Sequence, residues 1–390
     1  MQVYLVGGAV RDSLLGLPVK DKDFVVVGAG FDTIKKLGFT QVGADFPVFL
    51  HPDTHHEYAL ARIERKNGVG YQGFSTQTKS VSLADDLLRR DLTINALAIE
   101  VIGLFDDTPT TGEVIDLYGG LTDLSNKTLR HISPAFTEDP LRILRTVRFL
   151  ARYFEQGFKI ADETLTLMQT MAKAGELSQL SRERIWAESI KTMQTGTAHH
   201  YWQALKTLRI LPYLLKELDD HWQNDSIFNQ IIHDLSLAKN HTIAVQFAIM
   251  CGGHLGDDTT NKTLIQKIAN RLNTPNYPVQ IATLLTEFHA IFNKTPNAND
   301  IIRLIEKTKA HQGEQRTLND VIMTIFIVTK KPIISKNQAM TLLNDAINTY
   351  KSVGIHEIDP SLKGKEIGMA LTKLRLSKLQ DTLNEHVNDA

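Results

Sequence analysis

The sequence contains a single cysteine, Cys251, in 390 residues, and it has no long uninterrupted apolar run. One cysteine excludes an intramolecular disulfide framework and fits a reducing compartment. No window reaches the ~18 apolar residues expected of a membrane-spanning helix. Arg11 and Asp12 interrupt the one apolar stretch near the start, so no signal peptide is expected. These absences favour a cytoplasmic protein with no membrane contact.

The chain also has no large excess of charge of one sign, because it contains 43 Lys and Arg and 44 Asp and Glu, which gives a formal net charge of −1. Net charge therefore does not draw the whole chain to nucleic acid, although a neutral total can still contain a local basic stripe. Hydrophobic residues make up 42% of the chain, and no tract is of low complexity. We expect a folded protein that is long enough for two or more hydrophobic cores.

The pattern of the sequence changes near residue 135. Before it, short β-branched or apolar runs alternate with turn residues, which predicts strands, a helix after the first strand and another near 32–37. After it, apolar residues recur at helical spacing nearly to the end. We therefore expect an α+β protein with an N-terminal mixed sheet and its helices, followed by an all-α remainder.

The first predicted strand ends in Gly7-Gly8 and leads into a helix. Backbone N–H groups at such a junction can face an anion, and the missing Cβ lets a phosphate or sugar approach closely; an ordinary turn is the alternative. The next strand opens with Asp21 and Asp23, whose spacing points both side chains to one face. Two carboxylates there form an oxygen site suited to Mg²⁺, and a solvated strand end is the alternative.

The combination of these features is more specific than either one. The stretch “YLVGGAVRDSLLGLPVKDKDFVVVG” resembles the first motif of the bacterial CCA-adding enzymes, tRNA nucleotidyltransferases that share their class with bacterial poly(A) polymerases. Their superfamily includes DNA polymerase β. The resemblance implies that Gly8 and Arg11 meet the nucleotide. It also implies that Asp21 and Asp23 hold two Mg²⁺ ions. Glu57, on a later predicted strand, is a candidate third carboxylate, with a surface acid as the alternative.

A second motif lies at residues 85–98, “DDLLRRDLTINALA”, which is similar to the second motif of the same family. Arg90 could pair with triphosphate oxygens. Asp91 and Asn95 are one helical turn apart and could bind a ribose. The alternative is an amphipathic helix with its leucines in the core and its arginines in solvent, but the order of the motifs favours function.

The third motif, “EDPLRILRTVRF”, resembles the family's segment at the junction of its head and neck. Carried over, Asp139 and Arg142 would read the Watson–Crick edge of the incoming base, with Glu138 holding the arginine. Arginine donates to the ring acceptors of cytosine, and a carboxylate accepts from the exocyclic amine of C and A. CTP and ATP would then be selected over UTP and GTP. An ordinary helix start is the alternative, and both can hold.

Arginines continue along this predicted helix, because Arg142, Arg145, Arg148 and Arg152 recur at spacings of 3, 3 and 4 and form a basic stripe. Arg145, like Arg142, matches a family position that contacts nucleotide. The last two are expected either at RNA phosphates or in solvent. Residues 64–82 match the place of the family's mobile loop, which is thought to govern the switch from CTP to ATP; a flexible surface loop is the alternative.

Related enzymes often carry a metal phosphohydrolase site in the helical remainder, and here that motif is incomplete. His233 stands where a first ligand could lie, but Gly252-Gly253 occupy the place of the His-Asp pair. Glycine has no side chain to bind a metal. His254 and Asp257 lie nearby at a different spacing, and we expect them at the surface. The sequence therefore predicts a degenerate region without hydrolase activity.

The resemblance implies four domains. They are a nucleotidyltransferase head at 1–135, a helical neck at 136–212 with the nucleotide-selecting helix and an RNA-binding surface, a helical body at 213–325 and a helical tail at 326–390. Basic clusters at 182–186 and 373–378 could touch the acceptor arm of tRNA. Solvated helix faces are the alternative, preferred for the second cluster.

The function that the resemblance implies is template-independent addition of CCA to the 3′ end of tRNA from CTP and ATP, with release of pyrophosphate. No protein partner is evident. A poly(A) polymerase is one alternative, but those enzymes usually carry basic terminal extensions. A partial enzyme that adds only CC or only A is another. An RNA-binding chaperone with a vestigial site is disfavoured by the intact motif residues.

Overall fold

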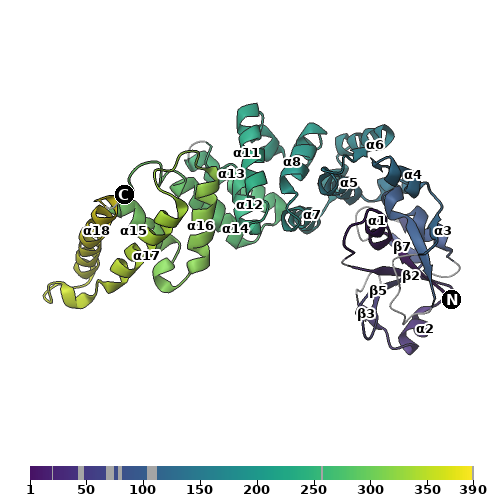
Figure 1. Cartoon of the computed structure of the whole chain (residues 1–390), viewed down its shortest axis with the longest axis horizontal. Helices are drawn as coiled ribbons and strands as arrows, with labels where there is room; N and C mark the ends of the chain where they lie inside the picture. The colour runs from purple at the N-terminus through teal and green to yellow at the C-terminus, as the bar shows by residue number, and fades with distance from the viewer. Residues whose placement is uncertain are drawn as a thin grey trace. The chain divides into compact units, whose positions relative to one another are not determined.

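The computed structural model describes residues 1–19, 21–42, 48–66, 74–77, 81–102, 112–255 and 258–388. The chain divides into two units, which are formed by Met1–Glu188 with Ala204–Leu214 and by Ser189–Gln203 with Leu215–Ala390. Figure 1 follows the chain through both, from purple to yellow. The finer division at residues 135, 212 and 325 stays a prediction.

The main sheet of the first unit has seven strands among the described residues, in the order β3-β4-β5-β2-β1-β8-β9. β1 pairs antiparallel with β2 and β8, whereas β2 and β5 run parallel, so the sheet is mixed as predicted. The strands are β1 Gln2–Val6, β2 Asp23–Val27, β3 Thr40–Val42, β4 Val48–Leu50, β5 Glu57–Leu60, β8 Leu97–Val101 and β9 Val114–Asp116. Two smaller pairs are the antiparallel pair of β6 Ile63–Lys66 and β7 Phe74–Gln77, and the parallel pair of β10 Thr128–Leu129 and β11 Lys159–Ile160.

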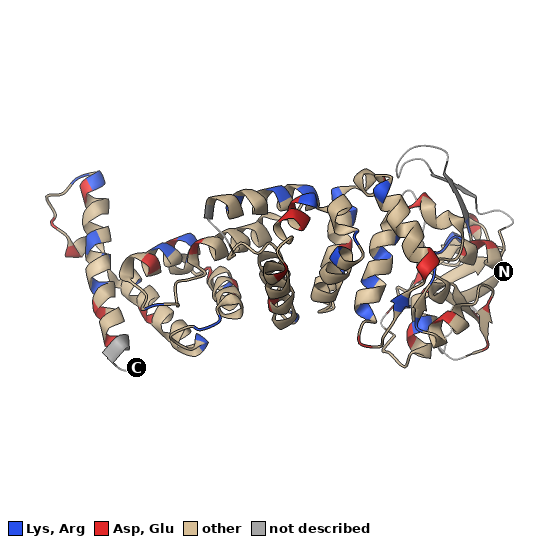
Figure 2. Cartoon of the chain, turned by 90° about the horizontal axis from the view of Figure 1, so that it is seen from above, with Lys and Arg blue, Asp and Glu red and all other residues tan. Residues whose placement is uncertain are grey.

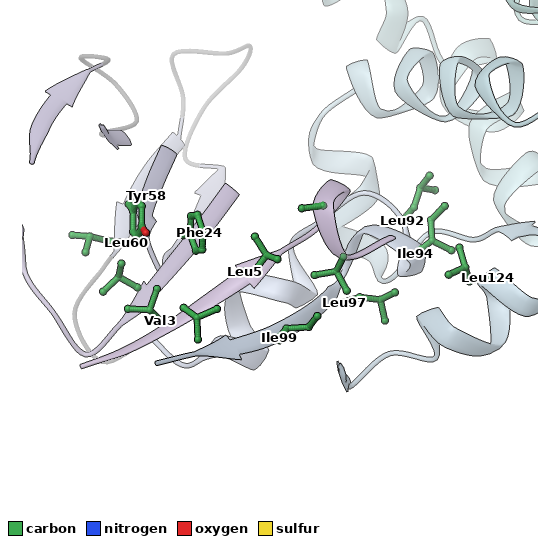
Figure 3. Close-up of a cluster of buried hydrophobic side chains, with 14 of the residues drawn as sticks. Val3, Leu5, Phe24, Tyr58, Leu60, Leu92, Ile94, Leu97, Ile99 and Leu124 are labelled. Carbon is green, nitrogen blue, oxygen red and sulfur yellow. The ribbon is translucent and has the colours of Figure 1, made fainter. Parts of the chain in front are cut away.

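Strand β1 lies between two apolar clusters, which explains its continuous apolar run. Val3 and Leu5 join the cluster drawn in Figure 3, with residues of β2, β5 and β8. Tyr4 and Val6 join a second cluster, because successive side chains of a strand point to opposite faces. The buried strand is thus a fixed support for the glycine turn that follows it.

The predicted helices after the first strand and near residue 35 are confirmed. The helices of this unit are α1 Gly8–Leu14, α2 Phe31–Lys36, α3 Leu83–Leu88, α4 Gly120–Ser125, α5 Leu141–Arg152 and α6 Asp162–Lys173, and α7 Arg182–Gln194 begins in it.

The helical interpretation of residues 85–98 is wrong. Helix α3 ends at Leu88, the chain passes through the 3₁₀ turn Thr93–Asn95, and β8 follows at Leu97. Leu88 is 40% exposed, so the expected leucine stripe is only partly core. The apolar segment after Asn95 pairs with β1 and is buried there, and this tertiary gain outweighs local helix propensity.

The second unit is helical in its described part, as predicted for the remainder. Its helices include α12, whose residues from Ala244 to Met250 are all buried and which packs against α14 and α16. Charges of both signs are scattered along the helices (Figure 2). None of the described helices is long and apolar enough to cross a membrane. The bounds are α8 Ala198–Thr207, α9 Leu211–Leu214, α10 Lys216–His221, α11 Asp225–Leu237, α12 Ile243–Met250, α13 Asp258–Leu272, α14 Asn276–Phe288, α15 Ala298–Lys307, α16 Gln315–Val328, α17 Lys336–Ser352 and α18 Lys365–Asn388; α8 and α9 lie wholly or partly in the first unit.

Candidate active site

The predicted junction of strand, glycine turn and helix is present after β1. Gly7 has φ 68° and ψ −120°, which L side chains avoid, and its N–H donates to the carbonyl of Leu97 at 3.0 Å. A Cβ on Gly7 would lie 2.9 Å from Nη1 of Arg90. Glycine therefore permits both the turn and the close approach of an arginine that the sequence had assigned to a separate motif.

Three carboxylates lie near this turn. Asp23 opens β2, and its partner in the parallel pairing with β5 is Glu57. Neighbouring protein atoms partly desolvate the carboxyl of Asp23, and this desolvation raises its pKa. The charge of Arg90 opposes this rise, whereas the charge of Asp21 adds to it. Burial also raises the pKa of Glu57, and the charges of Asp23 and Asp21 raise it further. The three groups thus repel one another, as carboxylates do that share one patch.

Carboxylate oxygens are the donors that Mg²⁺ prefers, so these residues fit the ion that the sequence implies. Among the described residues, however, no three His, Cys, Asp or Glu side chains converge closely enough to hold a metal ion. The assignment of Asp21, Asp23 and Glu57 as metal ligands therefore stays a prediction.

Arg90 is held beside the turn by Asp86, a residue that the sequence analysis missed. Its Nη2 lies 3.2 Å from Oδ2 of Asp86, and Nη2 of Arg89 lies 2.7 Å from the other oxygen. Burial alone would raise the pKa of Asp86, but the two arginines hold it below its usual range. The spacing of four residues between Asp86 and Arg90 was an available signal for this pair.

Asp91 and Asn95 are brought together by the 3₁₀ turn and not by a helix. Asn95 Nδ2 donates to Asp91 Oδ1 at 2.8 Å, and its Oδ1 accepts from Arg11. Arg145 Nε donates to Asp91 Oδ2 at 2.7 Å. Burial would raise the pKa of Asp91, but Arg145 and Asn95 hold it well below its usual range. Four residues chosen from three sequence motifs therefore meet in one network.

Arg11 is the buried end of this network, with 3% of its surface exposed. Its Nη2 lies 2.8 Å from Asp12 Oδ1, and its guanidinium carbon lies 4.8 Å from the ring centre of Phe149. Asp12 also accepts from Arg152 Nη2 at 2.8 Å and from the hydroxyl of Tyr153 at 2.9 Å. Arg11 is thus engaged with protein groups, and its contact with a nucleotide stays a prediction, as does that of Gly8.

We call these linked groups the arginine network. It contains three arginines and two aspartates, which leaves one excess positive charge (3 − 2 = 1) beside the glycine turn. Its members are Arg11, Asp12, Asp91, Asn95, Arg145 and Arg152.

The third motif forms a different helix start from the one expected. Glu138 ends the 3₁₀ turn Pro134–Glu138, Asp139 is extended, and α5 begins at Leu141. Oδ1 of Asp139 accepts from the N–H of Leu141 at 3.1 Å, so Asp139 caps the helix. Its Oδ2 lies 2.8 Å from Nη2 of Arg184 on α7. Arg184 belongs to the basic cluster at 182–186 and was missed as a partner of this carboxylate.

Arg142 is held by two main-chain carbonyls. Nη1 donates to Ala135 O and Nη2 to Arg89 O, each at 2.6 Å. Within the described residues no hydrogen bond or ion pair joins Glu138 to Arg142. These carbonyls fix the guanidinium of Arg142, and both the support from Glu138 and the reading of a base by Arg142 stay predictions.

The last two arginines of the stripe also form ion pairs within the protein, and their contact with RNA stays a prediction. Arg148 Nε donates to the buried Glu188 at 2.6 Å, and Arg152 binds Asp12. The arginines on α5 therefore connect this helix to α1, to the turn before β8 and to α7. The sequence did not predict these pairs, because their acidic partners lie far away in the chain.

The helical remainder corrects another expectation. His254 was expected at the surface, but its side chain is only 4% exposed, and Nε2 lies 3.5 Å from Oδ2 of Asp234. A Cβ on Gly252 would lie 2.8 Å from Nε2 of His221 and 2.7 Å from Ile231 Cδ1. Side chains from neighbouring helices thus fill the space that a ligand at this position would need. His233 is exposed.

Two predictions fall on other parts of the chain. In the cluster at 373–378, Arg375 lies over the ring of Tyr350 at 4.0 Å and Lys378 pairs with Glu357. Residues 67–73 and 78–80 of the expected mobile loop lie outside the described residues, as does Asp257.

Two family models match the sequence. A model of the poly(A) polymerase head domain matches residues 3–130, and one described as a probable RNA- and SrmB-binding site of polymerase A matches residues 157–221.

Solved structures share the fold. One is a CCA-adding enzyme in an apo form, 21% identical with a TM-score of 0.66 over 100% of this chain and 90% of that chain. A CCA-adding enzyme with ATP is 22% identical, with a TM-score of 0.64 over 99% and 89%. A tRNA-processing enzyme complex is 23% identical, with a TM-score of 0.59 over 97% of each chain.

The matched head contains the glycine turn, the three carboxylates and the segment from Arg90 to Asn95, and the shared fold extends over the helices that follow. The head of the chain is therefore similar to the poly(A) polymerase head domain, and the chain as a whole shares its fold with solved CCA-adding and tRNA-processing enzymes.

Proposed function

We propose that this protein adds CCA to the 3′ end of tRNA, without a template, from CTP and ATP. The observation that carries the proposal is the position of Arg90. It lies against the glycine turn at Gly7 and close enough to Asp23 for its charge to oppose the rise that burial causes in the pKa of that carboxyl. A cation for phosphate oxygens therefore stands beside the carboxylates proposed to bind metal, which is the arrangement that nucleotidyl transfer requires.

Asp21 and Asp23 would hold two Mg²⁺ ions, with Glu57 as a third carboxylate. Bound there, Mg²⁺ would make the attacking hydroxyl more acidic and stabilise negative charge on the departing group. The 3′-hydroxyl of the tRNA would release its proton to solvent as its oxygen bonds to the α-phosphorus of the nucleotide, while the bond from that phosphorus to the bridging oxygen would break and pyrophosphate would leave. The raised pKa values of Asp23 and Glu57 support this role, because a cation would relieve their repulsion.

The triphosphate would be bound by Arg90 and by the excess positive charge of the arginine network. Arg145 and Arg152 are the network members on α5, and 35% of each side chain is accessible. Their partly satisfied guanidinium groups can donate further N–H groups to phosphate oxygens. Asp91 and Asn95, fixed in the network, would orient the sugar.

Base choice would lie at the start of α5. The carboxylate of Asp139 is 27% exposed and can accept from the exocyclic amine of C or A. UTP presents a carbonyl oxygen at that place, and the two acceptors would repel. Arg142 would donate to the ring acceptors, with Glu138 nearby.

The RNA partner would be the acceptor arm of tRNA. Support comes from the match of residues 157–221 to an RNA-binding segment and from a shared fold with tRNA-processing enzymes.

The test is an addition assay. Purified protein with Mg²⁺ is incubated with tRNAs that end before the first C, after C and after CC, with each nucleoside triphosphate separately. We expect CTP to be added to the first two and ATP to the third, after which growth stops. No addition of CTP to the shortest tRNA would refute the proposal.

The match to a poly(A) polymerase head domain supports a second candidate function, the addition of a poly(A) tail. A poly(A) polymerase would extend the tRNA ending in CC, or an unrelated RNA, into a long A tail. A partial enzyme would stop after CC, or would act only on the tRNA ending in CC. Each outcome is distinct on one sequencing gel.

A further inference from the structure

The carboxylate of Asp139 is held at both of its oxygens. Oδ1 accepts from the N–H of Leu141 at 3.1 Å, and Oδ2 lies 2.8 Å from Nη2 of Arg184. Both side chains of the ion pair are about one quarter exposed, so the carboxylate is fixed but can still accept from a ligand.

The orientation of this carboxylate matters because discrimination needs a repulsive contact as well as an attractive one. A fixed carboxylate accepts from the amine of C or A and meets the carbonyl of U or G with like partial charge. A carboxylate that can turn about its side-chain bonds escapes that repulsion. The hydrogen bond from the N–H of Leu141 fixes only Oδ1, so without a second contact the carboxylate plane could still turn about its Cβ–Cγ bond.

We propose that Arg184 is a positioning residue for base selection, which holds the carboxylate of Asp139 in the orientation that rejects UTP and GTP. The inference rests on the proposed function. It assigns Arg184 no contact with the nucleotide, because its effect passes through Asp139.

A second contact between α7 and α5 provides a matched control. Glu188, one turn after Arg184, accepts from Arg148 Nε at 2.6 Å. Arg184→Gln and Glu188→Gln each remove one ion pair between the same two helices. Only the first releases the selecting carboxylate.

The experiment measures kcat/KM for CTP and UTP on tRNA lacking CCA, for the wild type and the two variants, with folding checked by circular dichroism. Loss of a hydrogen bond to a charged group predicts that Arg184→Gln lowers the CTP/UTP ratio by about tenfold. Most of the change is a gain in UTP use. Glu188→Gln should keep the wild-type ratio even if it lowers stability, and Arg184→Lys should restore part of the ratio.

A double-mutant cycle separates positioning from a general structural effect. In an Asp139→Asn background the Arg184→Gln change should leave the CTP/UTP ratio unaltered, because the carboxylate it orients is gone. An equal fall in kcat/KM for both nucleotides, or the same change of ratio in Glu188→Gln, would overturn the inference while leaving CCA addition intact. Failure of the wild type to prefer CTP would instead refute the proposed function.

Discussion

Both units bury charged side chains, but they satisfy them to different degrees. In the arginine network, Asp91 accepts from Leu92 N–H, Asn95 and Arg145. In the second unit, His221, Asp234 and His254 form a group that we call the body cluster. Among the described residues, Asp234 Oδ2 and both ring nitrogens of His254 have no hydrogen-bond partner, although Nε2 of His254 lies 3.5 Å from Oδ2 of Asp234.

This difference shows which buried polar side chains are held in fixed positions by hydrogen bonds and which are not. A buried carboxylate with several charged donors is fixed in place and stays ionised. A buried polar group without partners costs free energy and fixes little. The network lies beside the motif residues, whereas Gly252 and its neighbours leave no room for a further side chain in the body cluster. The chemistry is therefore expected in the first unit alone.

The largest expected effect is on catalysis. Asp23→Ala should lower CCA addition by ~10³-fold or more, because it removes a carboxylate on which charge stabilisation depends. Binding of tRNA, measured by gel shift, should persist. Asp234→Asn in the body cluster should leave addition unchanged per folded molecule. Retained activity in the first variant would contradict the metal assignment.

Next in size is the stability of the network. Asp91→Ala should destabilise the first unit by about 3 kcal/mol, because a buried ion pair loses one partner. Urea denaturation followed by fluorescence measures this loss. The pKa of Asp91 is depressed in the folded state, so its stabilisation is present above the unfolded value of about 4 and is lost as pH falls below it. The gap between wild type and variant should therefore narrow below about pH 4; a constant gap would show that packing and not charge is responsible.

Gly252→Ala tests the closed space in the body cluster. Gly252 has φ 61°, and the new Cβ would approach His221 and Ile231. Gly313 also has a positive φ, 98°, but nothing within 4 Å of the Cβ position. Gly313→Ala should cost about 1 kcal/mol from backbone strain, and Gly252→Ala at least about 1 kcal/mol more from overpacking. Equal losses in thermal unfolding would mean that the space is not closed.

The smallest expected effect is the repulsion between carboxylates. Without metal at pH 7, Asp23→Asn should raise the Tm slightly, because it removes a charge that raises the pKa of Glu57. The raised pKa values mean that proton-linked stability is present at low pH and is lost as pH rises through the folded values. The difference should therefore vanish below about pH 4. Mg²⁺ should raise the Tm of the wild type and not of the variant, and an equal rise in both would place the ion elsewhere.

The amino-acid sequence by itself determined the α+β class, the mixed sheet, the glycine turn and the order of the motifs. These features are local: apolar runs end at turn residues, and Gly7 lies sixteen positions from Asp23 (23 − 7 = 16). Arg11, Asp91, Asn95 and Arg145, which the sequence selected from three motifs, also meet in space, and their roles as site residues stay predictions.

Only the tertiary structure decided how those groups are used. Arg11 binds Asn95 across 84 positions, Asp12 binds Arg152 across 140, and Asp139 binds Arg184 across 45. No local spacing encodes such pairs, because each depends on the sheet and helices that place distant segments together. For the same reason the segment before β8 became a turn and a strand, and His254 became buried: packing against distant residues outweighed the local pattern.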